Sequence, residues 1–223
     1  MNRSLTRQLL LWGAIALVFV SLAGCGGSTP VPSVEGDPET HLEQGRQYLE
    51  QGKITEAIAE FEAVIQLDPG SVEGHFRLGN AHFQQGDLPR AAKEFEASLE
   101  LEPDNVDARS NLGAVYYEQG QFGKAEEEFG RAISLNPDDA DIHYNLGATY
   151  VQQAKYDPSI AEFREALRLN PNLARAYFGL GNTYKLQGKK QEAIEALEKF
   201  LTMSDDAQLQ AIAESLLAEL KAP

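Results

Sequence analysis

The side chains best suited to chemistry in this 223-residue sequence are four histidines and one cysteine, Cys25. A lone cysteine forms no disulfide within its own chain, and it excludes a cysteine-rich metal site. The histidines are His41, His75, His82 and His143. All but His82 occupy one position of a regular sequence period, so neighbouring histidines lie a whole unit apart. Zinc ligands must lie about 2.0–2.1 Å from the ion, so we expect packing or surface roles and no metal site.

The sequence also lacks the familiar patterns of catalytic and phosphate-binding sites. It has no Walker lysine motif, no glycine-rich loop after a strand and no His-Glu-x-x-His. Acidic pairs such as Asp138 and Asp139 fall in predicted turns, whereas general acid–base catalysis needs an enclosed site. We therefore predict that the chain is not an enzyme and has no catalytic residue, no cofactor and no small-molecule substrate.

The charge balance narrows the choice of partners. The chain has 19 Lys and Arg residues against 34 Asp and Glu residues, which gives a net charge of -15. Nucleic-acid binding needs a basic surface, so this balance argues against it. The same balance disfavours adhesion to anionic lipid head groups, and it favours a soluble surface or a basic partner.

The first 24 residues have the pattern of a secretory signal peptide. Arg3 and Arg7 precede an apolar run over residues 9–20. A positive start, an apolar stretch of about 7–15 residues and an exit of small residues define such a signal. A membrane-spanning helix needs about 20 apolar residues, but the segment 24–28 ends this run early. We therefore predict export and removal of residues 1–24.

The exit sequence Leu22-Ala23-Gly24-Cys25 resembles the lipobox of bacterial lipoproteins. The resemblance implies cleavage before Cys25, a diacylglyceryl group on its sulfur and acylation of its new amine. Two or more acyl chains hold a protein stably on a membrane, whereas one holds it only marginally. Two alternatives remain open. Ser21-Leu22-Ala23 is also an ordinary cleavage site, and an uncleaved apolar run would itself be an anchor.

Residues 25–37 are predicted to form the lipidated end and its tether. The stretch 26–36 is rich in glycine, proline and serine and shows no apolar period, which is typical of a linker. Gly26 follows the cysteine, so the acidic retention residue that some enterobacterial lipoproteins carry there is missing. This favours display on an outer membrane, facing the periplasm or the cell exterior.

Residues 38–207 repeat with a period of 34, which is the signature of a repeat architecture. One glycine position recurs in every unit: Gly45, Gly79, Gly113, Gly147 and Gly181. A proline position closes four units: Pro69, Pro103, Pro137 and Pro171. A second glycine position is Gly52, Gly86, Gly120 and Gly188, with Ala154 in the gap. A large apolar position is Phe61, Phe95, Phe129, Phe163 and then Leu197.

Each unit is predicted to contain two short helices. In the third unit, Leu112, Val115 and Tyr116 share one helical face, and a second apolar stripe follows the turn. Gly120 suits the chain reversal between the two helices, because a positive φ is often required there. Pro137 ends the second helix, because it lacks an N–H and pushes its predecessor out of the α region.

This pattern resembles the tetratricopeptide repeat, in which a leucine–glycine pair, small and aromatic residues and a closing proline recur in register. The resemblance implies an all-α fold, a right-handed superhelical α-solenoid of five helix-turn-helix repeats. The repeats are 38–71, 72–105, 106–139, 140–173 and 174–207. Residues 208–223 are predicted to form a capping helix. Its apolar face is predicted to comprise Leu209, Ile212, Leu216 and Leu220.

The resemblance also implies where a partner binds. Positions 2, 5, 9 and 12 of each repeat share one face of its first helix, and in this family that face lines a concave groove for peptides or helices. The candidate groove residues are Phe76, Asn80, Phe83, Asp107, Asn111, Tyr117, Asp141, Tyr144, Asn145, Phe178 and Asn182. The aromatics are candidate anchors, and the asparagines can hydrogen-bond a peptide backbone. Alternatively, Phe83 and Tyr117 pack between repeats and the asparagines are ordinary surface residues.

Family members that bind chaperone tails clamp a terminal carboxylate with basic residues. Here Phe76 stands in place of the clamp lysine, and Asp141 and Asn145 replace other basic residues. We therefore expect no binding of acidic C-terminal tails. A partner segment with apolar anchors and some positive charge fits this groove better.

Three functions fit these features. The first is an exported, membrane-anchored scaffold or assembly factor for envelope or pilus machinery, a role that known lipoproteins of this build have. The second is a carrier that holds exported chains transiently, and the third is a non-catalytic adaptor subunit of a cell-wall enzyme. Stable co-purification supports the first function and weak binding to many unfolded chains the second. Changed activity of a bound hydrolase supports the third.

Overall fold

A computed structural model describes residues 35–222, and this part of the chain contains eleven α-helices and no strand. The first helices of the five repeats are α1 (Pro38–Glu50), α3 (Val72–Gln85), α5 (Val106–Glu118), α7 (Ala140–Gln152) and α9 (Ala174–Leu186). The second helices are α2 (Ile54–Leu67), α4 (Leu88–Leu101), α6 (Phe122–Leu135), α8 (Tyr156–Leu169) and α10 (Lys190–Leu201). A last helix, α11, covers Ala207–Lys221. The predicted signal peptide, Cys25 and the tether as far as residue 34 lie outside the described residues.

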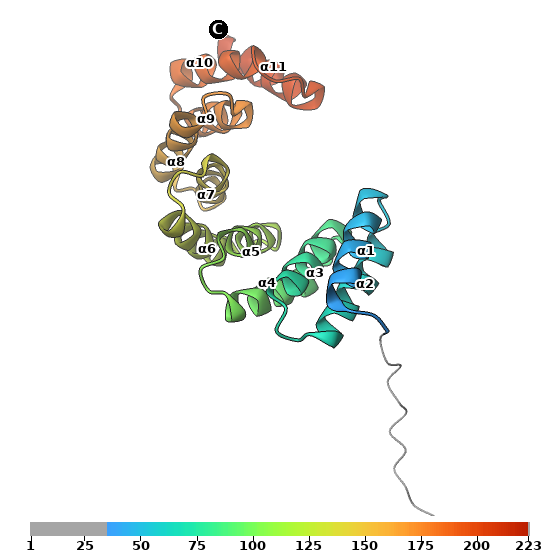
Figure 1. The fold of residues 1–223 in the computed structure, drawn as a ribbon. Coiled ribbons are helices and arrows are strands. Elements are labelled where there is room, and N and C mark those ends of the chain that lie inside the picture. The colour runs from blue at the N-terminus through green and yellow to red at the C-terminus, as the bar shows by residue number, and fades with distance from the viewer. Residues whose placement is uncertain (1–34, 223) are drawn as a thin grey trace, which may run out of the picture. The chain divides into compact units, whose positions relative to one another are not determined.

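The helices form an all-α solenoid of antiparallel pairs. Each first helix packs against the second helix of its own repeat, and each second helix packs against the first helix of the next repeat. First helices of adjacent repeats also touch, from α3 to α9. The described array follows a curve with α5, α7 and α9 on its inner side (Figure 1).

The core of each repeat forms where the first helix meets a large side chain of the second. Phe61, Phe95, Phe129 and Phe163 are at most 2% exposed, and Leu197 is fully buried. Each lies against the glycine that recurs in the facing first helix, so close that an added Cβ would fall within 2.4–2.9 Å of its side chain. Glycine at this position therefore allows the two helices to approach each other.

Left-handed backbone joins the two helices of every repeat. Four of these turns use glycine, with φ between 71° and 83°. Ala154 fills the position in repeat 4 with φ 55°, the one residue other than glycine with positive φ in residues 35–222. An L-residue with a Cβ is strained there by about 1–2 kcal/mol.

We expect Ala154→Gly to raise the free energy of unfolding by about 0.5–1 kcal/mol, because relief of this strain exceeds the extra backbone entropy of glycine. Ala161→Gly is the matched control, since Ala161 is exposed within α8. The same exchange there should lower stability by about 1 kcal/mol. Chemical denaturation of both variants measures the difference, and a destabilised Ala154→Gly protein would contradict the strain.

The array ends in α11, which packs against α10. The carboxylate of Asp206 caps its start by accepting bonds from the backbone N–H groups of Gln208 and Leu209. The face buried against the array is centred on Ala213 and Leu217. Ile212, which was predicted to lie on the apolar face of this helix, is 44% exposed at the edge of the packed face. The prediction was therefore wrong at Ile212, because the packed face is rotated by about one residue.

No helix in the described part of the chain is both long and apolar enough to cross a lipid bilayer.

Candidate protein-binding groove

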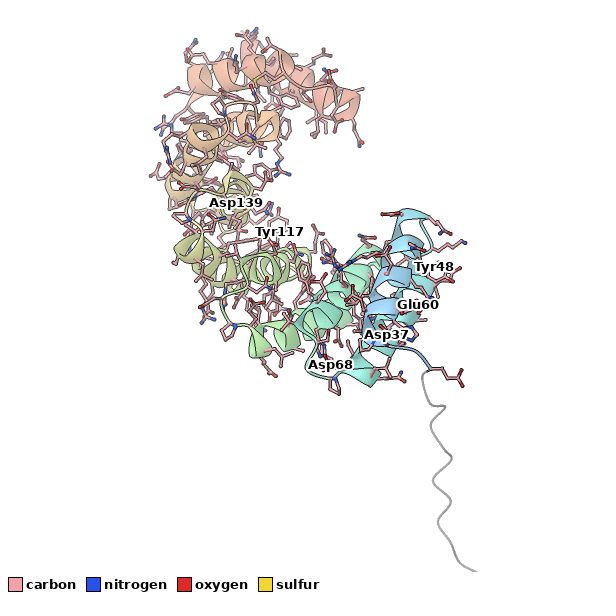
Figure 2. All side chains as sticks on the ribbon, in the orientation of Figure 1. Asp37, Tyr48, Glu60, Asp68, Tyr117 and Asp139 are labelled. Atoms are coloured by element: carbon pink, nitrogen blue, oxygen red, sulfur yellow. The ribbon has the colours of Figure 1, made fainter. Side chains whose placement is uncertain are left out.

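The predicted groove residues all lie on the first helices α3, α5, α7 and α9. The helices that carry them follow one another along the inner side of the curve, where Figure 2 labels Tyr117. The structure does not place these residues in a single environment. Some pack into the core, some bond to each other and some surround a cavity.

The position-5 aromatics are partly incorporated into the core. The ring of Phe76 lies 6.0 Å from that of Phe95, and the ring of Phe178 lies 5.3 Å from that of Phe200. Tyr144 and Phe163 make the equivalent contact at 5.6 Å. The three position-5 rings are half-buried, so each presents only part of its surface to a partner.

The position-12 aromatics also make contacts within the array. Phe83 is half-buried and packs against the core of repeats 2 to 4. Tyr117 meets Phe122 edge-on, with ring centroids 5.5 Å apart. Its hydroxyl oxygen accepts a 3.3 Å bond from the amide of Gln152 in the next repeat. Both residues therefore contribute to packing while keeping a half-exposed surface.

The asparagines are not equivalent. The side-chain amide of Asn111 donates to the amide oxygen of Asn80 at 2.8 Å, which links α5 to α3. Asn182 is half-buried on α9. Asn145 lines a cavity between α5 and α7. The Asn80–Asn111 pair thus stabilises the junction of repeats 2 and 3, whereas Asn145 faces open space.

The acidic residues of the inner face differ in pairing. Asp141 lies 2.5 Å from a guanidinium nitrogen of Arg175, whose charge sits 4.3 Å from the centre of the Tyr144 ring. Asp107 is exposed and makes no ion pair within residues 35–222. Glu118, which the sequence interpretation did not select, is likewise exposed and has no ion pair among the described side chains.

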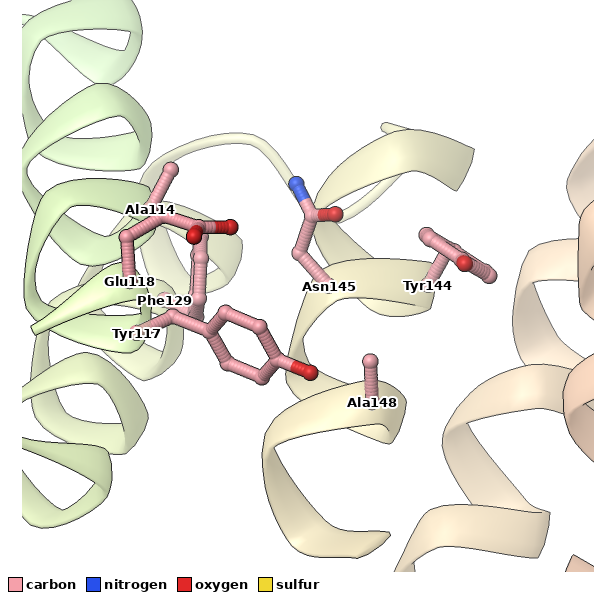
Figure 3. A pocket seen from close by; sticks show the side chains of 7 residues that line it. All are labelled: Ala114, Tyr117, Glu118, Phe129, Tyr144, Asn145 and Ala148. Atoms are coloured by element: carbon pink, nitrogen blue, oxygen red, sulfur yellow. The ribbon is translucent and has the colours of Figure 1, made fainter. Parts of the chain in front are cut away.

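A cavity of about 220 Å³ opens between α5 and α7 (Figure 3). Its walls are Ala114, Tyr117 and Glu118 from α5, and Tyr144, Asn145 and Ala148 from α7. The buried ring of Phe129 contributes to its base. Ala114 and Ala148 occupy position 9, where repeats 2 and 5 carry asparagine. Small side chains at two consecutive repeats therefore leave the space that larger ones would fill.

The three periodic histidines each link the second helix of their own repeat to the segment that precedes the repeat. Their Nδ1 atoms lie 2.6–2.8 Å from the carboxylates of Glu60, Glu94 and Glu162. Their Nε2 atoms lie 3.0–3.3 Å from the backbone oxygens of Glu35, Pro69 and Pro137. In repeat 3, Arg109 makes the same two contacts with Glu128 and Pro103. No group of three metal-ligating side chains occurs in residues 35–222.

The His41 bridge makes stability depend on pH. Both of its ring nitrogens face acceptors, so the charged imidazolium satisfies both. The hydrogen bond with Glu60 raises the pKa of His41 above 6.5, and burial opposes the shift; the carbonyl of Glu35 and the charge of Asp37 add to it. Because the folded-state pKa is raised, the stabilisation is complete below about pH 6.5 and is lost as the pH rises through that pKa.

We therefore expect the stability difference between the wild type and His41→Gln to be largest in mildly acidic buffer and to shrink in mildly alkaline buffer. Urea denaturation across this range measures the difference, which we expect to stay below about 1 kcal/mol. A difference that does not change with pH would show that the pKa of His41 is the same in the folded and the unfolded protein.

His82 is the exception among the histidines. It is 2% exposed and occupies the position where the other repeats carry tyrosine, as at Tyr116 and Tyr184. Burial lowers the pKa of His82, because the charged form loses its hydration. Its Nδ1 is buried and has no hydrogen-bond partner. The packing role predicted for this residue agrees with its place in the core.

Models of known families match the part of the chain that repeats every 34 residues. A family model described as TPR repeat matches residues 113–154 and 147–188. Three models described as tetratricopeptide repeat match residues 42–106, 94–127 and 174–206. The chain is a tetratricopeptide-repeat protein. The matches run almost continuously through the helical array, so the whole solenoid belongs to this family.

Solved TPR structures share this fold at low sequence identity. The crystal structure of MamA is 24% identical, with a TM-score of 0.67, and the match covers 77% of this chain and 96% of MamA. YrrB, described as a TPR protein with an unusual peptide-binding site, is 22% identical, with a TM-score of 0.68 and coverage of 80% and 92%. Pseudomonas aeruginosa pilF is 19% identical, with a TM-score of 0.69 and coverage of 82% and 88%. No curated protein matches the sequence.

Proposed function

We propose that this TPR protein is an exported, lipid-anchored scaffold that binds a segment of a partner protein along the inner face of its first helices. In this proposal the protein has no catalytic role and assembles envelope components at a bacterial membrane. The solenoid recognises the partner, and the lipids on Cys25 hold the complex on the membrane.

The observation that carries the proposal is the composition of the inner face. Half-buried aromatic rings, exposed carboxylates and a cavity lie along consecutive first helices. Aromatic side chains held rigidly by a core lose little entropy on binding and dominate interface energies. The described peptide-binding site of YrrB, on the same fold, supports the use of such a surface for a peptide.

The anchor rests on the sequence. The lipobox resemblance places the single cysteine directly after a signal-like segment. Two or more acyl chains give stable membrane attachment without a spanning helix. Such an anchor suits a scaffold, because it concentrates the binding surface where membrane-bound partners assemble.

Cell fractionation tests the anchor with Cys25→Ser. We expect the wild type in the membrane fraction and the variant in the soluble exported fraction, because the variant has no thiol to acylate. A variant that stays wholly in membranes would indicate an uncleaved apolar anchor. A soluble wild type would indicate ordinary signal-peptide cleavage, and either result would contradict the lipid anchor.

Crosslinking in native membranes tests the binding face. The half-buried rings of Phe76, Tyr144 and Phe178 contact the core, so replacing them with alanine would also lower stability. Asp107→Lys is a cleaner change, since Asp107 is exposed on α5 and forms no ion pair within the described residues. We expect it to remove or weaken the crosslinked partners.

The matched control is Glu100→Lys, which makes the same charge change at an exposed position of a second helix, α4. Its crosslinked partners should equal those of the wild type. One stable, stoichiometric partner supports a scaffold, whereas weak crosslinks to many unfolded chains would favour a carrier. Identical partners for both variants and the wild type would reject the inner face as the binding surface.

A further inference from the structure

The inner face of this solenoid already holds arginine side chains between aromatic rings and carboxylates. Arg175 lies over the ring of Tyr144 and pairs with Asp141. Arg77 lies 5.7 Å from the ring centre of Phe76 and donates a 2.7 Å bond to Glu73. A planar guanidinium can stack on a ring while its N–H groups bind a carboxylate.

The cavity between α5 and α7 offers the same components without an arginine of its own. Tyr117 supplies aromatic surface, and Glu118 supplies an exposed carboxylate at the end of α5, whereas the Tyr144 ring on the α7 side is already in contact with Arg175. The amide oxygen of Asn145 is a further acceptor. Figure 3 shows the Tyr117 ring pointing from α5 toward α7, with Asn145 on the opposite wall.

We propose that this cavity binds one arginine side chain of the partner segment. The aliphatic stem would pack between Ala114 and Ala148, and the guanidinium would lie against Tyr117 with its N–H groups directed to Glu118 and Asn145. This inference rests on the proposed function, because it assumes a partner segment along the inner face. It adds the identity of the side chain that the third and fourth repeats select.

Size and charge both favour this occupant. The cavity holds about 220 Å³, less than the roughly 300–1,000 Å³ of pockets for small molecules, and this suits a single side chain. The net charge of the chain is -15, so a cationic segment is attracted and an acidic one is repelled. Within residues 35–222 no cation pairs with Glu118, so an incoming arginine need not displace an internal partner.

Peptide selection on the full-length lipidated protein in detergent tests this inference. The probe is a phage-displayed pool of short random peptides, and the selected peptides are then synthesised for affinity measurement. We expect arginine at one position of the selected peptides. We expect Glu118→Gln to weaken the best peptide about tenfold, as loss of a charge-assisted hydrogen bond would.

Glu50→Gln is the matched control, because Glu50 occupies the same repeat position at the exposed end of α1. It should leave affinity unchanged. Replacing the peptide's arginine with alanine should abolish the effect of Glu118→Gln, as expected if the two groups interact directly. Replacement with lysine should also weaken binding, because an ammonium cannot stack and bond as a guanidinium does.

The outcomes separate the two proposals. Two results would overturn the arginine pocket and leave the binding face in place. One is that selected peptides bind without arginine. The other is that the peptides are insensitive to Glu118→Gln but sensitive to Asp107→Lys. Selected peptides with an aromatic or aliphatic residue in the cavity would do the same. Failure to select any peptide would overturn both proposals.

Discussion

Replacing Phe129 with alanine is expected to lower the free energy of unfolding by about 3–5 kcal/mol, the usual effect of removing a buried phenylalanine side chain. The ring is 1% exposed and lies in the core cluster that spans repeats 2 to 4. The ring packs directly against the first helix at Gly113, where an added Cβ would fall 2.9 Å from it, so its removal leaves a gap between α5 and α6. Thermal and urea denaturation followed by circular dichroism measure the loss.

The control is Leu135→Ala on the same helix, α6. Leu135 is 41% exposed, so its truncation should change stability by no more than about 0.5 kcal/mol. Comparable losses in both variants would show that Phe129 is not part of the core. Because repeat arrays can unfold in parts, hydrogen exchange should also show the loss centred on repeats 3 and 4.

Adding a single methyl group at Gly113 is expected to have the second largest effect. A Cβ at this position would fall 2.9 Å from two ring carbons of Phe129, and the surrounding core prevents the ring from moving away. We expect Gly113→Ala to lower the free energy of unfolding by about 1–3 kcal/mol through overpacking. The higher helix propensity of alanine, about 1 kcal/mol, offsets part of this overpacking cost.

Gly130→Ala makes the same chemical change at another helical position of the same repeat. An added Cβ there meets nothing within 4 Å, so helix propensity alone should act and stability should rise by about 0.5–1 kcal/mol. The two variants should therefore shift the denaturation midpoint in opposite directions. A stabilising Gly113→Ala would contradict the close helix approach in the structure.

Much of the fold was predictable because its periodic residues have local causes. Each first helix begins at the first residue of a predicted repeat. The glycines that face the phenylalanines and the glycines in the turns recur every 34 residues, because each repeat needs the same approach and the same left-handed turn. The TPR fold follows from these positions, and family comparison confirmed it.

The candidate site was less predictable, because it depends on contacts between repeats. The sequence pointed to Asn80 and Asn111 as separate groove residues, whereas the structure joins them by a hydrogen bond. The sequence did not point to Ala114 and Ala148, because these residues matter only through the empty space that their small side chains leave between α5 and α7. Glu118 was missed because it lies one position beyond those assigned to the inner face.

The contacts between the histidines and glutamates could have been predicted from a regular spacing in the sequence. A glutamate follows His41, His75 and His143 by 19 residues, and Arg109 has the same relation to Glu128. The exchange of histidine for arginine at one register indicates a requirement for a side-chain N–H donor. Period analysis that compares charge type as well as residue identity would therefore have predicted the pairing.

The pattern of helix contacts has a mechanical consequence. All major contacts join helices that are neighbours in sequence or first helices of adjacent repeats. Each junction between two repeats can therefore rotate slightly, and these small rotations add up along the array to a large change in its curvature. A partner segment that is wider or narrower than the curve of the array can be accommodated by small deformations distributed over all repeats, without the unfolding of any single repeat.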